Sequence, residues 1–440
     1  MAEDYRAIAQ EIAEDIDAGR LQPGDRLPPQ RQFAWRRGIA PSTASRVYAE
    51  LTRRGLIVGE VGRGSFIRSA PPADHPTLAE PPALPINLET NYPILPDQHA
   101  ILASILRQIA ANPEVIQRIL RETSVRATIT TRDSVAKVMH WQGWRAQANQ
   151  LLFAGNGRQA LAATLSALAR PGERIGFETM TYPMAKTIAA KLGLVAVPLA
   201  MDEQGLIPEA VEAAYRAAPL RAIYVQPTVH NPLGITMPAP RRAALAKMLQ
   251  SLESVVAIED AIYAFLDADA PPPLVSFAPD HTILLDAMSK RLGPGLTLAF
   301  VVAPPPWIEP ISLSFMSGGW GPSGFALEVC LRLLLDGGMA ALEQAKRVDA
   351  QIRQAEAANA LSGLTWQAHP SSYHLMIDLP EGQRAETLVA AAKAQGIAIT
   401  PASAFAVQAA HAPNAVRIGL ANLAPEVIGA VLGKIARLIG

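Results

Sequence analysis

Four polar side chains in the last two thirds of this chain are suited to holding a small molecule that carries an aldehyde. Lys290, in the motif MSK, offers an amine that can form a Schiff base with a carbonyl carbon. Asp260 ends the apolar run VVAIED, and Tyr263 follows it three residues later. Asn231 stands in QPTVHNPLG. An amine, a carboxylate, a phenol and an amide predict a site in which a covalently held ring is oriented through its polar edges.

Glycines, a basic residue and an aromatic ring complete this set. The motif GNGR follows the apolar run LLFA and opens a helical pattern, so Gly157 and Arg158 stand where backbone N–H groups bind a phosphate. Tyr182, in TYP, can lie flat on a ring. Pyridoxal 5'-phosphate needs all of these: an amine, a carboxylate for its pyridinium nitrogen, donors for its hydroxyl and N–H groups for its phosphate. The set predicts this cofactor, with Lys290 as the catalytic lysine and no metal.

Each piece has an ordinary structural explanation when it stands alone. A Ser-Lys pair is usually a surface lysine, and glycines after a strand usually just turn the chain. An Asp at a strand end is often a helix cap, and Tyr182 alone is typical of a core. The order of the set along the chain is what favours the coenzyme site.

Short apolar runs that alternate with helical stretches must position these groups. The candidate strands are Leu151–Ala154, Arg174–Glu178, Val195–Leu199, Ala222–Gln226, Val255–Glu259, Thr282–Asp286 and Leu298–Val302. Helical stretches such as Gln159–Ala169 and Ala239–Leu252 lie between them. This alternation predicts an α/β fold with a mostly parallel sheet, whose ligands bind at the carboxyl ends of the strands. Residues from about 341 to 440 are predicted to form a smaller lobe.

The first 68 residues carry a different pattern, typical of a small helical domain. Tyr5, Ile8, Ile12 and Ile16 form one apolar stripe of a helix. A third helix is expected from Ser42, as its N-cap, to Gly55, with hydroxyls and arginines on its outward face. Two short strands then flank VGRG as a hairpin. These residues hold eleven Arg and no Lys against nine Asp and Glu, so an ordinary bundle with a solvated basic face is the alternative.

Composition fixes the broad class. At 440 residues, 50% hydrophobic and 18% charged, the chain predicts two or three folded domains. Zero formal net charge confines any nucleic-acid contact to a local surface. The sequence has no signal-peptide pattern and no apolar run of membrane-spanning length, which indicates a cytoplasmic protein. The one cysteine, Cys330, is expected in a core. The predicted domains are 1–68, a proline-rich linker 69–86, and 87–440.

The N-terminal motifs resemble the winged helix-turn-helix of the GntR family of bacterial regulators. The similar runs are PGDRLPPQR, RRGIAPSTASRVYAELTRRGLI and GRGSFI. The resemblance implies binding to a double-stranded DNA operator through one residue before the recognition helix, four in that helix and three in the wing: Arg31, Ser42, Thr43, Ser45, Arg46, Gly62, Arg63 and Gly64. Pro41 departs from the basic or hydroxyl residue common there, so base specificity does not carry over.

The rest of the chain resembles the fold-type I aminotransferases. The resemblance adds Arg417, in VRIGL, as the residue that binds the α-carboxylate of a substrate or effector. Two positions depart from the family pattern: Ala287 and Thr297 stand where a hydroxyl residue and an arginine usually bind the phosphate. The segment RETSVRATITTRDS also lacks the usual glycine- and tyrosine-bearing pattern. We therefore expect Arg158 to supply positive charge to the phosphate.

A GntR-like head fused to an aminotransferase-like domain resembles the MocR subgroup. The resemblance implies a homodimeric transcription regulator, rather than a multiple-turnover enzyme, that senses pyridoxal phosphate, an amino acid or an amine through an aldimine at Lys290. One alternative is an active aminotransferase with an accessory DNA-binding head. A third possibility is a regulator whose pocket has lost the coenzyme and binds another ligand.

Overall fold

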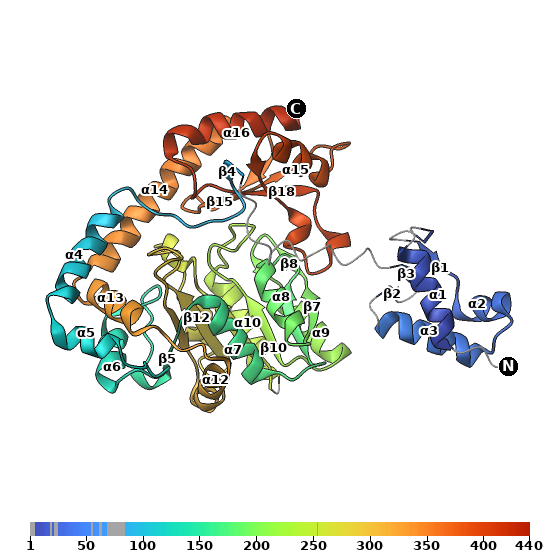
Figure 1. Cartoon of the computed structure of the whole chain (residues 1–440), viewed down its shortest axis with the longest axis horizontal. Coiled ribbons are helices and arrows are strands. Elements are labelled where there is room, and N and C mark those ends of the chain that lie inside the picture. Colours follow the sequence, from blue (N-terminus) through green and yellow to red (C-terminus); the bar gives the residue numbers. More distant parts are fainter. Residues whose placement is uncertain are drawn as a thin grey trace. The chain divides into compact units, whose positions relative to one another are not determined.

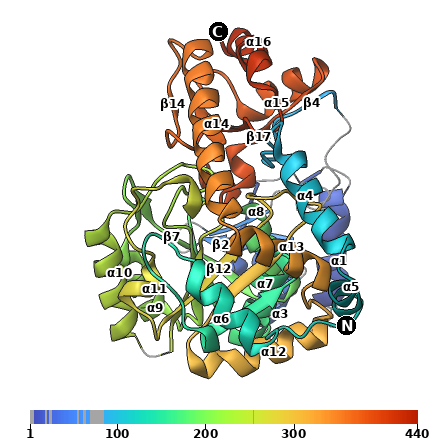
Figure 2. The ribbon, with the colours of Figure 1, turned by 90° about the vertical axis from the view of Figure 1, so that its left-hand side faces the viewer.

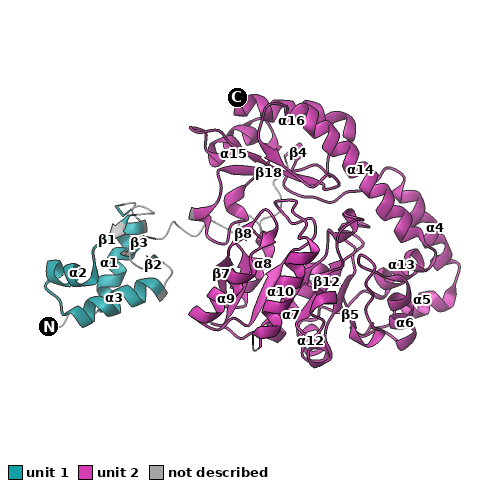
Figure 3. Ribbon diagram, turned by 180° about the vertical axis from the view of Figure 1, so that it is seen from behind, with its two compact units in different colours: residues 1–79 teal, residues 80–440 magenta. Residues whose placement is uncertain are grey.

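The structure, a computed structural model, describes residues 5–17, 20–21, 25–53, 56–60, 64–67, 84–252 and 254–440. It divides into two compact units, residues 1–79 and residues 80–440 (Figure 3). The predicted linker, 69–86, falls largely outside the described residues. Its last residue, Ile86, already belongs to a strand of the second unit.

The first unit is a winged helix-turn-helix (Figure 1). Its elements are α1 (Tyr5–Asp17), β1 (Arg26–Leu27), α2 (Gln30–Arg37), α3 (Pro41–Arg53), β2 (Ile57–Glu60) and β3 (Gly64–Ile67). The strands form an antiparallel sheet in the order β1-β3-β2. The predicted apolar stripe of α1 packs against α3, with Ile8, Ile12, Val47 and Leu51 in a common core. One face of α3 is therefore buried in this core, and the opposite face is left exposed to solvent.

The turn between α2 and α3 depends on two residues. Gly38 ends α2 with φ +64°, a left-handed conformation that suits glycine. Helix α3 then begins at Pro41, because a proline fits the first turn of a helix, where its missing N–H costs nothing. The expected N-cap at Ser42 is therefore wrong, since Ser42 lies inside the helix. The expected end at Gly55 and the wing residues Gly62 and Arg63 lie outside the described residues.

A seven-stranded sheet forms the centre of the second unit. Its strands are β5 (Leu151–Ala154), β6 (Arg174–Glu178), β7 (Val195–Leu199), β10 (Ala222–Val225), β11 (Val256–Asp260), β12 (Thr282–Ala287) and β13 (Ala299–Val302). Their order is β5-β13-β12-β11-β10-β6-β7, and only the pairs that involve β13 are antiparallel. The mostly parallel sheet predicted from the sequence is confirmed. The carboxyl ends of the six parallel strands lie along one edge, which is where such sheets bind ligands.

Helices cover both faces of this sheet (Figures 1 and 2). Successive strand residues point to opposite faces: Tyr224 packs in one core and its neighbours Ile223 and Val225 in another. The first face is covered by α7 (Gly157–Leu168), α8 (Pro183–Lys191) and α12 (Pro305–Gly318). The other is covered by α9 (Pro208–Ala217), α10 (Ala239–Ser251), α11 (Leu274–Phe277), α4 (Gln98–Ala110), α5 (Pro113–Ile119), α6 (Ile129–Val138) and α13 (Gly324–Leu335). Cys330 of α13 is buried in that core.

The long helix α14 (Gly338–Ala360) leads from the large domain into the small lobe (Figure 1). The lobe has a four-stranded antiparallel sheet, in the order β14 (Trp366–Gln367), β15 (His374–Asp378), β18 (Ala415–Gly419), β17 (Thr400–Pro401). Helices α15 (Ala385–Ala394) and α16 (Pro425–Ile439) pack on it. Strand β16 (Ile397–Ala398) pairs with β4 (Ile86–Asn87). The segment just after the predicted linker is therefore part of the small lobe. A small hairpin, β8 (Met201–Asp202) and β9 (Gly205–Leu206), follows β7.

Candidate functional site

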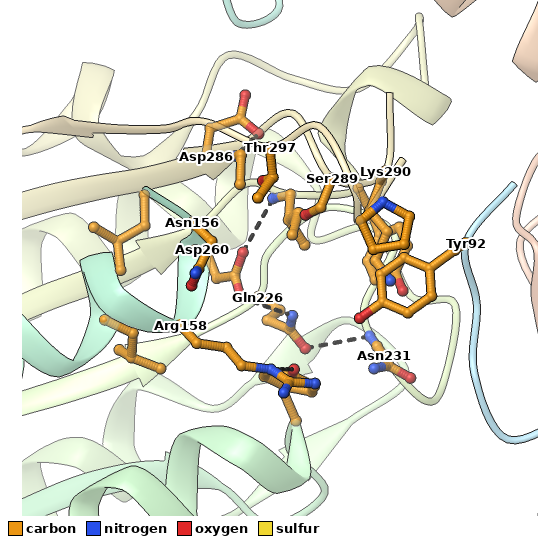
Figure 4. A pocket seen from close by; sticks show the side chains of 18 residues that line it. Tyr92, Asn156, Arg158, Gln226, Asn231, Asp260, Asp286, Ser289, Lys290 and Thr297 are labelled. Atoms are coloured by element: carbon orange, nitrogen blue, oxygen red, sulfur yellow. Dashed lines mark hydrogen bonds between the residues drawn. The ribbon is translucent and has the colours of Figure 1, made fainter. Parts of the chain in front are cut away.

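A pocket of about 240 Å³ opens at the carboxyl ends of the parallel strands (Figure 4). The loops after β5, β6, β10, β11 and β12 supply most of its wall. All seven residues predicted for the coenzyme line it: Gly157, Arg158, Tyr182, Asn231, Asp260, Tyr263 and Lys290. Residues from five separate loops meet here because the sheet places every loop at the same edge.

Lys290 reaches the pocket from the turn that follows β12. Its Nζ donates a hydrogen bond to the carbonyl of Asn91 at 2.6 Å and lies 3.9 Å from the ring centroid of Tyr92. Burial, with the charges of Arg417 and Arg158 added, holds the pKa of Lys290 well below its ordinary value. A lower pKa raises the fraction of neutral amine, which is the nucleophilic form.

Asp260, at the end of β11, is held by three donors. Its Oδ2 accepts from the hydroxyl of Tyr224 and from Nε2 of Gln226 at 3.2 Å, and its Oδ1 accepts from the backbone N–H of Ile262 at 3.0 Å. Burial raises the pKa of Asp260, while the hydrogen bonds from Tyr224 and Ile262 oppose that rise. The carboxyl group is fixed in the pocket wall (Figure 4).

The first turn of α7 forms another part of the wall. Asn156 caps this helix by accepting from the N–H of Gln159 at 3.0 Å. The helix start leaves unpaired N–H groups beside the pocket, as an anion site requires. A side chain at Gly157 would crowd this wall, because a Cβ there would lie 3.3 Å from the Cβ of Ala287. Arg158 donates from Nε to the hydroxyl of Tyr182 at 3.2 Å. Both of these predicted residues therefore lie at the part of the pocket wall formed by the start of α7.

Polar atoms left without partners show where a ligand fits. The side-chain oxygens of Asn231 and Thr297 are buried, line the pocket and have no hydrogen-bond partner among the described residues. Buried polar groups are rarely left in this state. With an amine, a fixed carboxyl group and a helix start around the same space, the residues fit a phosphorylated aromatic aldehyde.

Arg417 does not line the pocket, although its charge affects the pKa of Lys290. It lies in the middle of β18, is 2% exposed, and donates from Nη1 to the carbonyl of Glu89 at 2.9 Å. Its Nε is buried without a partner among the described residues.

Sequence reasoning missed several residues of the wall. Gln226 and Asn156 belong to two of the predicted motifs, QPTVHNPLG and GNGR, and their polar side chains beside predicted site residues are the signal that identifies them. Tyr92 gave no such signal, because it lies far from every motif in the sequence and is brought in only by the fold.

The described part of the head presents most of its predicted DNA contacts to solvent. Arg31 on α2 and Ser42, Ser45 and Arg46 on α3 are exposed, and Thr43 is partly buried. Arg46 also packs on α1, with its guanidinium 4.2 Å from the ring centroid of Tyr5. Gly64 begins β3.

The fold and the site define a pyridoxal-phosphate-type domain joined to a winged-helix head. Residues 85–435 match the family aminotransferase class I and II, and residues 4–67 match bacterial regulatory proteins, gntR family. The chain therefore belongs to the aminotransferase class I and II family and carries a GntR head, as MocR-type regulators do. The predicted family, fold class, DNA-binding regulatory function and pyridoxal 5'-phosphate cofactor are confirmed.

Known proteins resemble both the DNA-binding head and the aminotransferase-like domain of this chain. The HTH-type transcriptional regulator YdeF of Bacillus subtilis is 30% identical over 94% of this chain and 90% of its own length. The HTH-type pyridoxine biosynthesis transcriptional regulator PdxR of Corynebacterium glutamicum is 26% identical over 68% of this chain and 66% of its own. An archaeal alanine:glyoxylate aminotransferase shares the fold, with TM-score 0.73 and 20% identity over 80% of this chain and 90% of its own.

The described residues include no helix that could cross a membrane.

Proposed function

We propose that this regulator senses pyridoxal phosphate, or an amino acid or amine that reacts with it, through Lys290, and adjusts its binding to an operator accordingly. The observation that carries the proposal is the pairing, in one pocket, of a lysine with a depressed pKa and a fixed carboxyl group. The names of two relatives, PdxR and the vitamin B6 salvage pathway transcriptional repressor PtsJ of Salmonella typhimurium, favour a B6 compound as the signal.

The coenzyme, when bound, supplies an electrophilic aldehyde and an electron-withdrawing ring. In the proposal, Nζ of Lys290 would hold the aldehyde carbon, and Asp260 would keep a proton at the ring nitrogen. Tyr263 and Asn231 would donate to the ring hydroxyl, and Tyr182 would lie against the ring. Gly157 and Arg158 would bind the phosphate together with the N–H groups that begin α7. Arg417 takes the α-carboxylate of an effector through its unpartnered Nε.

For the head, we propose that α3 enters the major groove of a double-stranded operator. Ser42, Thr43, Ser45 and Arg46 would meet base edges and nearby phosphates, while Arg31 contacts a phosphate. Gly62, Arg63 and Gly64 would do the same from the wing. This role places the protein in the cytoplasm, where chromosomal DNA is found.

We also propose a homodimer, with a second copy seated on the exposed apolar surface around α12 and α13. Six exposed apolar side chains lie on these helices and on the segments near them: Ile94, Leu120, Ile129, Leu313, Met316 and Phe325. Arg126 pairs with Glu309 of α12 at 2.5 Å, which places the segment before α6 beside α12. Exposed apolar patches of this kind usually mark an interface, and two heads need two half-sites. Leu120→Glu with Met316→Glu should give a monomer by sedimentation, whereas Val195→Glu, on β7, should not.

A working aminotransferase with an accessory head is the second candidate, favoured by the presence of Lys290, Asp260 and Arg417. Against it stand Ala287 and Thr297, which offer the phosphate fewer partners than the family pattern does. Steady turnover of an amino acid with a keto acid would support the enzyme, and a half-reaction that stalls would support the sensor.

The visible spectrum of the protein with added pyridoxal phosphate tests the proposal. Wild type should show a band that borohydride fixes to Lys290, and Lys290→Ala should show none. Lys247→Ala is the control, because Lys247 is an exposed lysine on α10 and is not part of the pocket lining. No band in wild type would overturn the proposal in favour of a pocket that binds another ligand.

A further inference from the structure

Residues Glu89–Pro93, which we call the strap, carry an unusual pattern of hydrogen bonds. The carbonyl of Glu89 accepts from Nη1 of Arg417 at 2.9 Å, that of Asn91 from Nζ of Lys290 at 2.6 Å, and that of Pro93 from Nζ of Lys346 at 2.6 Å. The strap is thus bonded through three backbone carbonyls to basic side chains from three different elements.

The strap lies directly against the small lobe. The N–H of Leu88 donates to the carbonyl of Ala398, and the N–H of Gly419 donates to the carbonyl of Leu88 at 2.8 Å. Gly419 permits this approach, because a Cβ there would lie 2.8 Å from the carbonyl oxygen of Thr90. Asn422 also donates to that oxygen, at 3.0 Å. The strap is therefore tied both to the pocket and to the lobe.

Lys346, in α14, joins the strap to the loop that carries Lys290. It is fully buried, and its Nζ donates to the carbonyl of Lys290 at 3.1 Å as well as to that of Pro93. The hydroxyl of Tyr373 in turn holds the backbone of Lys346 at 2.8 Å. Among the described residues no acidic side chain forms an ion pair with Lys346, and its Nζ donates to backbone oxygens instead.

Of the three hydrogen bonds to the strap, the middle one, to the carbonyl of Asn91, comes from Lys290, the residue that would hold the coenzyme. On binding an aldehyde carbon, Nζ of Lys290 would retain at most one N–H and would move toward that carbon, so we expect its hydrogen bond to Asn91 to be lost. Arg417 can take a carboxylate through Nε and keep its Nη1 bond to Glu89, and Lys346 lies outside the pocket lining. Coenzyme binding would then remove the central contact and leave the two outer contacts in place.

We propose that the strap is the element through which Lys290 reports its ligand to the small lobe, and that Lys346 is the positioning residue that holds the strap and the lysine loop together. The hydrogen bonds of Glu89 to Arg417 and of Thr90 to Asn422 join the strap to the lobe, so a change at Lys290 reaches the lobe through the strap. This inference rests on the proposed function, because it requires that the coenzyme bind at Lys290.

Hydrogen–deuterium exchange of peptides covering residues 84–95, in the full-length protein, tests the proposal. Saturating pyridoxal phosphate should speed exchange at Leu88, Glu89 and Thr90 about fivefold, as expected for the loss of one net hydrogen bond. Lys290→Ala without coenzyme should show the same acceleration, and adding coenzyme to it should cause no further change. A visible band in wild type, with strap exchange unchanged or slowed, would overturn the inference and leave the proposed function standing.

Lys346 is tested in the same way. Lys346→Met should speed strap exchange without coenzyme, and Lys346→Arg should restore it, which a loss of general stability would not do. If Lys346→Met does not fold, Gly419→Ala displaces the strap from the lobe side, with Gly429→Ala in α16 as its control. Lys346→Met and Gly419→Ala should also reduce the change in operator affinity that pyridoxal phosphate causes, whereas Lys346→Arg and Gly429→Ala should leave that change as in wild type. Normal exchange in both variants would overturn the role of the strap, and absence of a visible band would remove the proposed function with it.

Discussion

The guanidinium of Arg158 and the hydroxyl of Tyr182 are joined by a hydrogen bond of 3.2 Å at the start of α7. One residue follows β5 and the other follows β6, so the contact links two loops of the pocket wall. The positive charge of Arg158 is thereby held beside the helix start, close to where a phosphate would bind.

Replacing Arg158 with Ala should weaken coenzyme binding at least tenfold, roughly 1.4 kcal/mol, because Ala287 and Thr297 leave few other partners for the phosphate. Titration of the visible band gives the dissociation constant. Arg216→Ala, an exposed arginine on α9, is the control. An unchanged constant in Arg158→Ala would show that the helix start is sufficient.

Ala287→Ser should strengthen coenzyme binding about fivefold. Ala287 lines the pocket opposite Gly157, whose missing side chain leaves room for a hydroxyl, and one added hydrogen bond contributes roughly 1 kcal/mol. The same titration measures the change, with Ala303→Ser as a buried alanine outside the pocket lining. Weaker binding would mean that the phosphate lies elsewhere.

Arg31→Ala should lower affinity for all DNA sequences alike and reduce the slope of log affinity against log salt by about 1. Arg46→Ala should instead change the preference between sequences. Fluorescence anisotropy at several salt concentrations measures both. Arg20→Ala, an exposed arginine paired with Asp15, is the control. Tight DNA binding by residues 84–440 alone would contradict the assignment of the head.

Stability should depend on pH through Lys346. Burial lowers the pKa of this lysine to about 7, while in the unfolded chain it keeps a value of roughly 10.4. Between these two values the unfolded state binds more protons, so the contribution of Lys346 to stability grows as pH rises and is lost as pH falls through about 7. Relative to Lys346→Met, wild type should gain roughly 2 kcal/mol between about pH 7 and pH 9 in denaturant unfolding. If the difference in unfolding free energy between wild type and Lys346→Met did not change with pH, Lys346 would be charged in the folded protein over this range.

The sheet could be predicted closely from the sequence. All seven strands were predicted within one residue at each end, because most of them are short, largely apolar runs bounded by turn residues. The start of α3 was misplaced, because Pro41 and Ser42 both favour a helix start and the proline prevailed. The coenzyme motifs likewise led to the residues that line the pocket, since each stands at the end of a strand or the start of a helix.

What the sequence did not reveal depends on contacts between distant segments. The pairing of β4 with β16, together with the hydrogen bonds of Leu88 and Thr90 to the small lobe, brings Tyr92 and the strap to Lys290. The paired strands have only two residues each, which is too short to leave a sequence pattern. Lys346 resembles an ordinary surface lysine in GMAALEQAKRVDA, and only the packing of α14 buries it. The packing of Arg46 on Tyr5 joins two helices in the same way.

The three acceptors of the strap are peptide carbonyls, which every amino acid possesses. Most substitutions within residues 89–93 would therefore preserve the pattern of bonds, with the exception of Tyr92, whose ring lies against Lys290, whereas deletion or insertion of a single residue would move the carbonyls away from their donors. The length of this segment would thus be constrained more strictly than most of its residues. Among relatives, we expect constant spacing between β4 and α4 while the residues other than Tyr92 vary, which is the reverse of what a catalytic motif leaves in an alignment.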